Sequence, residues 1–494
     1  MKWLNAAPEI FYFAASLWFF FWTFLPSPRG SADRPAASSP FNSSYATAAL
    51  LLASLGVVIC LLSSGREGFL FTRAFRVDLF SQVFKVLLAI GLCLIVCISG
   101  GADVRDLRRG SVPAAGPTGE FYFLLFTCTG ALMLLSSAGH LLSIYVSLEL
   151  SSYSLYLLTA LRKREEYAVE AGIKYFLIGT FSSAVMLLGM ALIYSTTGAA
   201  YLDDISRSMP QVIAAPGAVI GLVLTLGGFF FKLAVFPFHF WAPDVYQGAS
   251  NPVAAYIATA SKVGAIAVIL RVVAFTGQGS HYLALTLAIL AVVSMTVGNL
   301  AAIVQKDFKR LLAYSTIAHS GYVLLGILVL SPAGYSGAIF YAVALLVMKF
   351  TAFMVIVEVA SDGRNLQIEE LAGLHRRSPI LALALLVSLF SLAGIPPTIG
   401  FTGKFLVFVA AVEKGYLALV IIAMVNVVIS LYYYLLAIRA AYLLEPAEEG
   451  PPLSVSLFSK TLAGASTAAM VFLGFFPAPL VELAQRAAAV LTAW

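Results

Sequence analysis

The sequence predicts an all-helical protein that crosses a membrane about fourteen times. Of its 494 residues, 61% are hydrophobic and only 11% are charged, which is more apolar surface than a soluble core of this size can bury. The apolar runs last about 20 residues each, the length that a helix needs to cross ~30 Å of hydrocarbon. Within lipid, only helices and closed β-barrels satisfy every backbone polar group. The runs lack the alternation of apolar and polar residues that is typical of barrel strands, so we expect helices.

Charged loops and clusters of Gly, Pro or Asn delimit the apolar runs. The first run is interpreted as a retained span, since it lacks a basic start and a small-residue cleavage site. The boundary between the fourth and fifth runs is the least distinct, because the short segment from Ser136 to His140 alone separates them. We expect spans near residues 8–26, 44–64, 77–99, 121–138, 140–161, 168–195, 215–240, 252–274, 282–304, 310–330, 335–360, 379–409, 415–443 and 455–476.

The basic residues indicate membrane topology. The net charge is +6, but Arg and Lys gather in short loops such as Arg162–Arg164 and Lys306–Arg310, so we do not expect nucleic-acid binding. With the N-terminus outside, the inner loops carry the excess of positive charge, and both termini are then expected to face outward. The cysteines Cys60, Cys93, Cys97 and Cys128 lie inside apolar runs, and we expect them to be packing residues.

Two predicted spans are interrupted by glycine and proline. They are the seventh, between Gly227 and Pro243, and the twelfth, between Gly394 and Gly403. The two lie five spans apart, and a repeat with an odd number of spans inserts its second copy upside down. We therefore predict discontinuous seventh and twelfth helices and two inverted five-helix repeats. The expected divisions are an N-terminal three-helix segment at 1–120, repeats at 121–275 and 276–444, and a C-terminal helix and tail at 445–494.

Ionisable residues within the spans are the candidate functional residues. A charge at the centre of a membrane helix costs ~2.5–3.5 kcal/mol, so such residues point to an ion or proton path. Glu149, Lys232, Lys262 and Lys404 lie at central depth, where a side chain cannot reach the interface. His319 and Lys349 are further candidates, with a satisfied core histidine and a structural lysine as the alternatives. Lys85, Lys174 and Arg439 lie nearer to span ends, where we expect the charge either to reach the interface or to pair statically.

Lysine suits proton transfer because burial disfavours its charged form, whereas a nearby carboxylate favours it. Movement of Glu149 toward or away from Lys232 would switch that lysine between proton uptake and release, so we expect a switching pair on spans five and seven. Pro237 has no N–H and is expected to free the carbonyl of Leu233 to meet water beside Lys232. The proline also predicts a helix break at Pro237–His239.

Several sequence motifs together resemble one protein family. The run KLAVFPFHFWAPDVYQGASNPVAAYIATASK extends from Lys232 to Lys262, and LEL surrounds Glu149. The segments AYSTIAHSGY, with His319, and GIPPTIGFTGK, with Lys404, complete the pattern. These motifs cover most of the chain and resemble the proton-antiporter-like membrane subunits of respiratory complex I and the related Mrp cation/proton antiporters.

Details of the motifs favour one branch of this family. Other members carry histidines where this chain has Tyr256 and Leu345, and one paralogue has Glu in place of Lys404. The longest paralogue continues with a lateral helix and more spans. These departures favour the subunit N branch of NADH-quinone oxidoreductases over the Mrp antiporters. They also weaken the case for Lys349 in the proton path, because the histidine usual four residues before it is Leu345 here.

The resemblance implies fourteen helices with a hydrophilic axis through Glu149, Lys232, Lys262 and Lys404, and we expect Lys404 to release protons outward. It also implies a bacterial inner-membrane location and other complex I membrane subunits as partners. The sequence shows no Gly-rich dinucleotide motif, iron–sulfur cysteine cluster or haem motif, so NADH, FMN, iron–sulfur clusters and quinone are expected on partner subunits. The alternatives are an Mrp-type cation/proton antiporter and a purely structural scaffold, which leaves the central charges unexplained.

Overall fold

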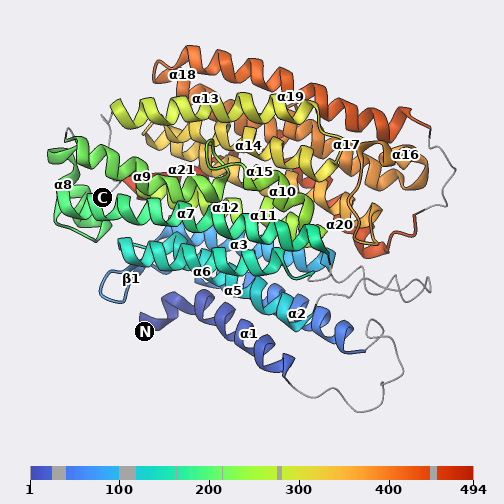
Figure 1. Cartoon of the computed structure of the whole chain (residues 1–494), viewed down its shortest axis with the longest axis horizontal. Helices are drawn as coiled ribbons and strands as arrows, with labels where there is room; N and C mark the ends of the chain where they lie inside the picture. Colours follow the sequence, from blue (N-terminus) through green and yellow to red (C-terminus); the bar gives the residue numbers. More distant parts are fainter. Residues whose placement is uncertain are drawn as a thin grey trace.

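The structure is a computed structural model that describes residues 2–24, 40–99, 118–162, 165–213, 215–274, 281–445 and 453–492. Long helices lie side by side with their axes along one direction (Figure 1). Twelve of the described helices are long and apolar enough to cross a membrane. The prediction of an all-helical, multi-pass membrane protein is confirmed.

Helices occupy all fourteen predicted span positions. The twelve helices of sufficient length and apolarity include every predicted span except the tenth, α14, which is more polar, and the twelfth, α17 with α18, which is broken. In chain order the spans are α1 (Ala7–Thr23), α2 (Pro40–Ser63), α3 (Leu79–Ser99), α5 (Gly119–Ser137), α6 (Leu141–Thr159), α7 (Glu166–Thr197), α9 (Pro216–Leu233) with α10 (Trp241–Gly248), α11 (Asn251–Ala258) with α12 (Ala260–Ala274), α13 (His281–Ile303), α14 (Phe308–Ile327), α15 (Pro332–Val359), α17 (Pro379–Ala393) with α18 (Ile399–Glu413), α19 (Leu417–Leu443) and α20 (Leu457–Phe475).

Shorter elements connect the spans. An antiparallel hairpin pairs Gly68 with Val77 and departs from the expected all-helical chain. The connecting elements are η1 (Lys2–Ala6), β1 (Gly68–Leu70), β2 (Phe75–Val77), α8 (Leu202–Val212), η3 (Ile368–Leu371) and α16 (Leu374–Arg377), and the chain's last described helix is α21 (Ala478–Thr492). The expected C-terminal tail is thus largely helical, and α21 packs against α15, α3 and α12.

The predicted breaks in spans seven and twelve are confirmed. α9 ends at Leu233 and α10 begins at Trp241, so the Pro237–His239 segment lies in the interruption. α17 ends at Ala393, and Gly394 follows with a φ of 87°, a conformation that favours glycine. The grouping of the spans into two inverted repeats, with boundaries at 120, 275 and 444, stays a prediction.

A third interruption was not expected. Thr259 separates α11 from α12 with φ −116° and ψ −91°, and its hydroxyl donates to the carbonyl of Ala255 at 2.6 Å. This i−4 side-chain bond competes with the helical ladder and bends membrane helices. The break lies three residues before Lys262.

Two spans form the centre of the bundle. Over an apolar stretch of 18 residues, every residue of the span from Asn251 to Ala274 is buried, and 94% of the residues are buried in the span from Pro332 to Val359. By contrast, only 28% of the residues of such a stretch are buried in α2 and in α20, which lie at the periphery. Ionisable residues on α12 and α15 are therefore surrounded by protein.

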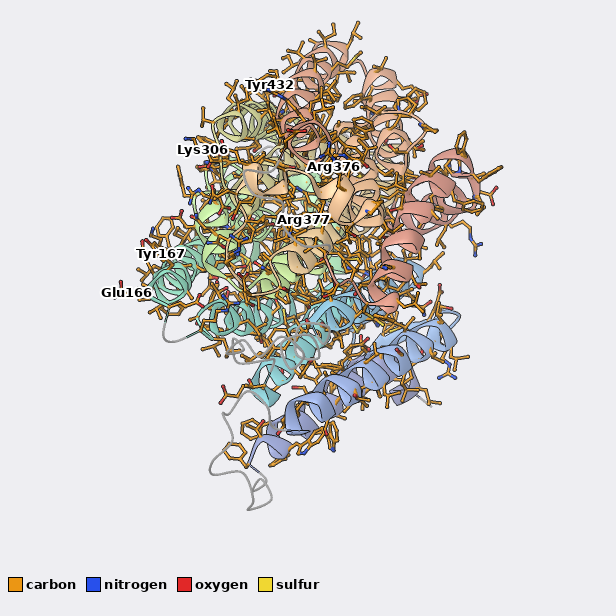
Figure 2. All side chains as sticks on the ribbon, turned by 90° about the vertical axis from the view of Figure 1, so that its right-hand side faces the viewer. Glu166, Tyr167, Lys306, Arg376, Arg377 and Tyr432 are labelled. Atoms are coloured by element: carbon orange, nitrogen blue, oxygen red, sulfur yellow. The ribbon has the colours of Figure 1, made fainter. Side chains whose placement is uncertain are left out.

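Both chain termini lie toward one end of the bundle. α1 begins and α21 ends toward the left-hand end of the molecule (Figure 1). The opposite end carries Lys306, Arg376 and Arg377, together with Glu166 and Tyr167 (Figure 2). Further basic residues assigned to inner loops from the sequence lie outside the described residues: Arg29, Arg34, Arg105, Arg108, Arg109, Lys163 and Arg164.

Candidate functional site

Lys232 lies in the last turn of α9, where the span is interrupted, and it is fully buried. Its ammonium donates to the hydroxyls of Ser151 and Ser152 on α6, at 2.9 and 3.1 Å. Glu149, one turn away on α6, accepts a short hydrogen bond from Ser183 of α7. Both groups lie in the described part of the chain, and no ion pair joins them in this structure; the switching pair stays a prediction.

The interruption of span seven exposes the last carbonyls of α9 to side-chain donors. The indole of Trp241 donates to the carbonyl of Phe231 at 3.0 Å, and the Lys262 ammonium donates to the carbonyl of Lys232 at 2.8 Å. The carbonyl of Leu233 accepts from Ser320 at 2.6 Å, the position where the sequence suggested water. The helix end is thus satisfied by residues from α10, α12 and α14.

A cavity lies between Lys262 and residues of the second half of the molecule. The Lys262 ammonium also lies 4.6 Å from the centroid of the Trp241 ring. A cavity of about 10 Å³ is lined by Lys262, His319 and Lys349, among other residues. This volume is at the lower bound for one water molecule.

Lys349 and His319 share a hydrogen-bonded series. The Lys349 ammonium donates to Ser315 at 2.7 Å and to the carbonyl of Leu312 at 2.9 Å. The Ser315 hydroxyl contacts the Tyr434 hydroxyl at 2.5 Å. That hydroxyl lies 3.2 Å from His319 Nε2, and Tyr341 lies 2.6 Å from Nδ1.

Lys404 lies just after the break of span twelve. Its ammonium donates to the carbonyls of Leu392 and Ala393, both at 2.9 Å, at the end of α17. It also lies 4.8 Å from the centroid of the Tyr322 ring. Lys262 and Lys404 therefore contact the carbonyl end of the first half of a broken span in the same manner.

The predicted residues form one buried system. Lys262 contacts the backbone carbonyl of Lys232 and borders the same cavity as Lys349 and His319, whereas Lys404 lies against the Tyr322 ring. The hydroxyl groups that hold these charges were not expected, because serine and tyrosine are common in membrane helices. The SLELSS spacing around Glu149 was the one available signal.

Lys309 is a further buried lysine, at a position that the sequence predicts to be a loop. Its side chain is almost completely buried, and its ammonium donates to the carbonyl of Ala249 at the end of α10, at 2.9 Å. Asp307 caps α14 by accepting from the amide of Arg310 at 2.9 Å. Burial raises the pKa of Asp307 despite this hydrogen bond and the nearby Lys309 charge.

Lys85 and Lys174 pair as expected for static residues. The Lys85 ammonium lies 2.6 Å from Glu9 on α1, and both side chains are buried. Lys174 pairs with Glu170 and Asp244 at 2.7 and 2.9 Å, with its side chain 43% exposed. The four cysteines are free, which agrees with a packing role.

Comparison with known proteins matches the sequence to one family. Residues 138–430 match the family model described as NADH:quinone oxidoreductase/Mrp antiporter, TM. The chain is 60% identical to NADH-quinone oxidoreductase subunit N 2 of Syntrophobacter fumaroxidans over 99% of this chain and 100% of that protein.

Two solved structures have the same fold. A chain of respiratory complex I from Thermus thermophilus with bound aureothin is 33% identical, has a TM-score of 0.80, and aligns over 98% of this chain and 99% of its own length. A chain of the Mrp complex from Dietzia sp. DQ12-45-1b has a TM-score of 0.81, with coverage of 99% and 98%. Its identity is 21%, so it shows the fold alone.

Proposed function

Because the chain belongs to the subunit N family of NADH-quinone oxidoreductases, we propose that it is a proton-translocating membrane subunit of a respiratory complex I. The observation that carries this proposal is the buried series of Lys232, Lys262 and Lys349, each held by hydroxyl or carbonyl oxygens. Such oxygens accept hydrogen bonds from a charged or a neutral lysine, so a proton can leave without breaking an ion pair.

The redox chemistry belongs to partner subunits in this proposal. NADH, FMN, iron–sulfur clusters and quinone would be bound by other subunits of the complex, and the neighbours of this chain would be other membrane subunits. The end with Lys306, Arg376 and Arg377 would face the cytoplasm of a bacterial cell by the positive-inside rule, which places both chain termini outside. The repeats at 121–275 and 276–444 would each hold part of the path.

We predict that Lys262→Ala and Lys404→Ala lower the number of protons moved per NADH oxidised while the complex still assembles. Lys404→Arg should fail as well, because arginine keeps its charge but does not release a proton. The measurement is acidification of membrane vesicles driven by NADH, alongside quinone reduction and complex abundance. Lys306→Ala, at an exposed position, is the matched control.

Full pumping in Lys404→Ala would remove its role in outward release. Full pumping in both alanine variants would contradict the proposed path. Acidification that follows a sodium gradient without NADH would instead favour the cation/proton antiporter.

A further inference from the structure

Five buried side chains from three helices form an unbroken hydrogen-bonded series in the second half of the bundle. Its order is Lys349, Ser315, Tyr434, His319 and Tyr341, with donor–acceptor distances of 2.7, 2.5, 3.2 and 2.6 Å. The side chains come from α15, α14 and α19, and all five residues are buried. Both ring nitrogens of His319 are therefore held by tyrosine hydroxyls.

The far end of the series lies beside α18. A Cβ placed on Gly403 would be 2.6 Å from the Tyr341 ring, so this ring packs directly on the backbone next to Lys404. The Tyr322 ring lies 5.8 Å from the His319 ring and also faces the Lys404 ammonium. The series thus extends from Lys349 toward Lys404.

Every member of the series can both give and take a proton. Serine and tyrosine hydroxyls donate and accept, and a neutral imidazole accepts at one nitrogen and donates from the other. The adjacent Tyr433 branches from the series, because its side chain interacts with Tyr434 and Ser315 and its hydroxyl donates to the amide oxygen of Asn299 at 3.0 Å. The Asn299 amide in turn donates to Asn426, so this branch ends on amides, which do not take up or release protons near neutral pH.

We propose that Tyr434 is a proton relay between Lys349 and His319, an inference that rests on the proposed function. The Lys349 ammonium gives a proton to Ser315, whose own proton moves to Tyr434, and the Tyr434 proton moves to His319 Nε2. His319 releases the proton on Nδ1 to Tyr341. The Tyr341 proton then leaves toward Lys404, whose neutral amine is the final acceptor.

Each intermediate group gains one proton and loses one, so the net change is one proton lost by Lys349 and one gained by Lys404. The hydroxyls and the imidazole must then rotate or exchange tautomer before the next transfer. Tyr434 is the step that no other hydroxyl in the series bypasses.

The test compares Tyr434→Phe with Tyr335→Phe in the assembled enzyme in membrane vesicles. Tyr335 of α15 is buried and does not belong to the series, so each substitution removes one buried phenol hydroxyl and keeps the ring. We expect Tyr434→Phe to lower the protons moved per NADH oxidised at unchanged complex abundance, and Tyr335→Phe to leave that ratio unchanged. We also expect Tyr434→Phe to change the solvent isotope effect, which is the ratio of the pumping rates in H₂O and D₂O. A purely structural role would not alter this ratio.

Ser315→Ala and Ser315→Thr provide a second comparison. Loss of pumping in the alanine variant with recovery in the threonine variant, which restores the hydroxyl, supports the relay. Full pumping in both Tyr434→Phe and Ser315→Ala would overturn it. Lys262→Ala in the same assay separates the two proposals: if it abolishes pumping while Tyr434→Phe does not, the relay alone is wrong.

Discussion

The buried lysines are held by oxygens that carry partial charge. Lys262 and Lys404 both donate to carbonyls at the end of a helix. The aligned peptide dipoles place about half a negative charge there, and a cation at this position gains ~0.3–1 kcal/mol, or up to ~2 kcal/mol in favourable partly buried sites. Removing one partner of a buried ion pair would cost about 3–5 kcal/mol. A helix end therefore stabilises the charged form of lysine less than a buried carboxylate does, so the lysine can release its proton more easily.

Glu149 and Lys232 provide a test of coupling between charged residues that do not touch. The hydroxyls of Ser151, Ser152 and Ser183 hold the two groups apart in this structure. For a switch, Glu149 and Lys232 must each give up a serine hydroxyl and contact each other. Hydrogen bonds to neutral groups are then replaced by an ion pair.

We predict that Glu149→Gln lowers proton pumping and leaves assembly intact, because the amide keeps the shape and the contact with Ser183. Lys232→Ala should also lower pumping, and the double variant should lose less than the sum of the two single losses. The measurement is vesicle acidification with complex abundance for all three variants. Additive losses, or full pumping in Glu149→Gln, would contradict a coupled pair.

At the scale of elements, the breaks determine where side chains can meet backbone carbonyls. The interruptions of spans seven and twelve could be predicted, because proline removes a helical hydrogen bond and glycine permits the sharp turn. The interruption at Thr259 could not, since threonine commonly bonds the i−4 carbonyl without ending a helix. Whether that bond bends the helix depends on the tertiary packing.

The lysines of the site could be predicted from depth alone, because a central charge has few structural uses in lipid. The linking hydroxyls could not be predicted. Ser320 bonds Thr316 within its own helix, as an ordinary buried serine does, and also donates to Leu233 on another helix. The contact with Leu233 depends on how α9 and α14 pack, which the sequence pattern of either helix does not specify.

We predict that Ser320→Ala destabilises the protein more than Ser388→Ala. Both serines are buried, but among the described residues Ser388 bonds only the carbonyl of Leu385 in its own helix. Loss of the Ser320 hydroxyl leaves the Leu233 carbonyl without this donor, at a cost of ~1–3 kcal/mol for a buried polar group. Thermal unfolding of the purified protein in detergent measures both variants. Equal shifts of the melting temperature would show that the Leu233 carbonyl finds another donor.

At the scale of the whole molecule, buried charges connect the N-terminal helices to the bundle. Arg271 of α12 contacts both oxygens of Asp78, just before α3, at 2.9 and 3.1 Å. Burial alone would raise the pKa of Asp78, but the Arg271 charge and hydrogen bonds hold it below its ordinary value. α21 also packs on α3, so the last described helix contacts one of the first.

The expected repeats do not form separate bodies. Lys309 and Arg310 of α14 contact Ala249 and Asp244 of α10 across the proposed boundary at 275. α10, α11 and α12 all pack against helices of the second half. A change in one half therefore has a packed route to the other, which proton transfer along the whole series requires.

The Glu9–Lys85 pair joins α1 to α3 outside the predicted repeats, and we predict that it is structural. Glu9→Leu and Lys85→Met should each lower complex abundance and thermal stability, because one buried charge is left without its partner at a cost of about 3–5 kcal/mol. The double variant should recover most of that stability, since apolar side chains of similar size can replace a buried pair. Its proton-to-electron ratio should equal that of the unchanged enzyme in NADH-driven vesicle acidification. An assembled double variant that fails to pump would instead place Glu9 and Lys85 on a proton path, as a second set of titratable groups beside the lysines of α9, α12 and α15.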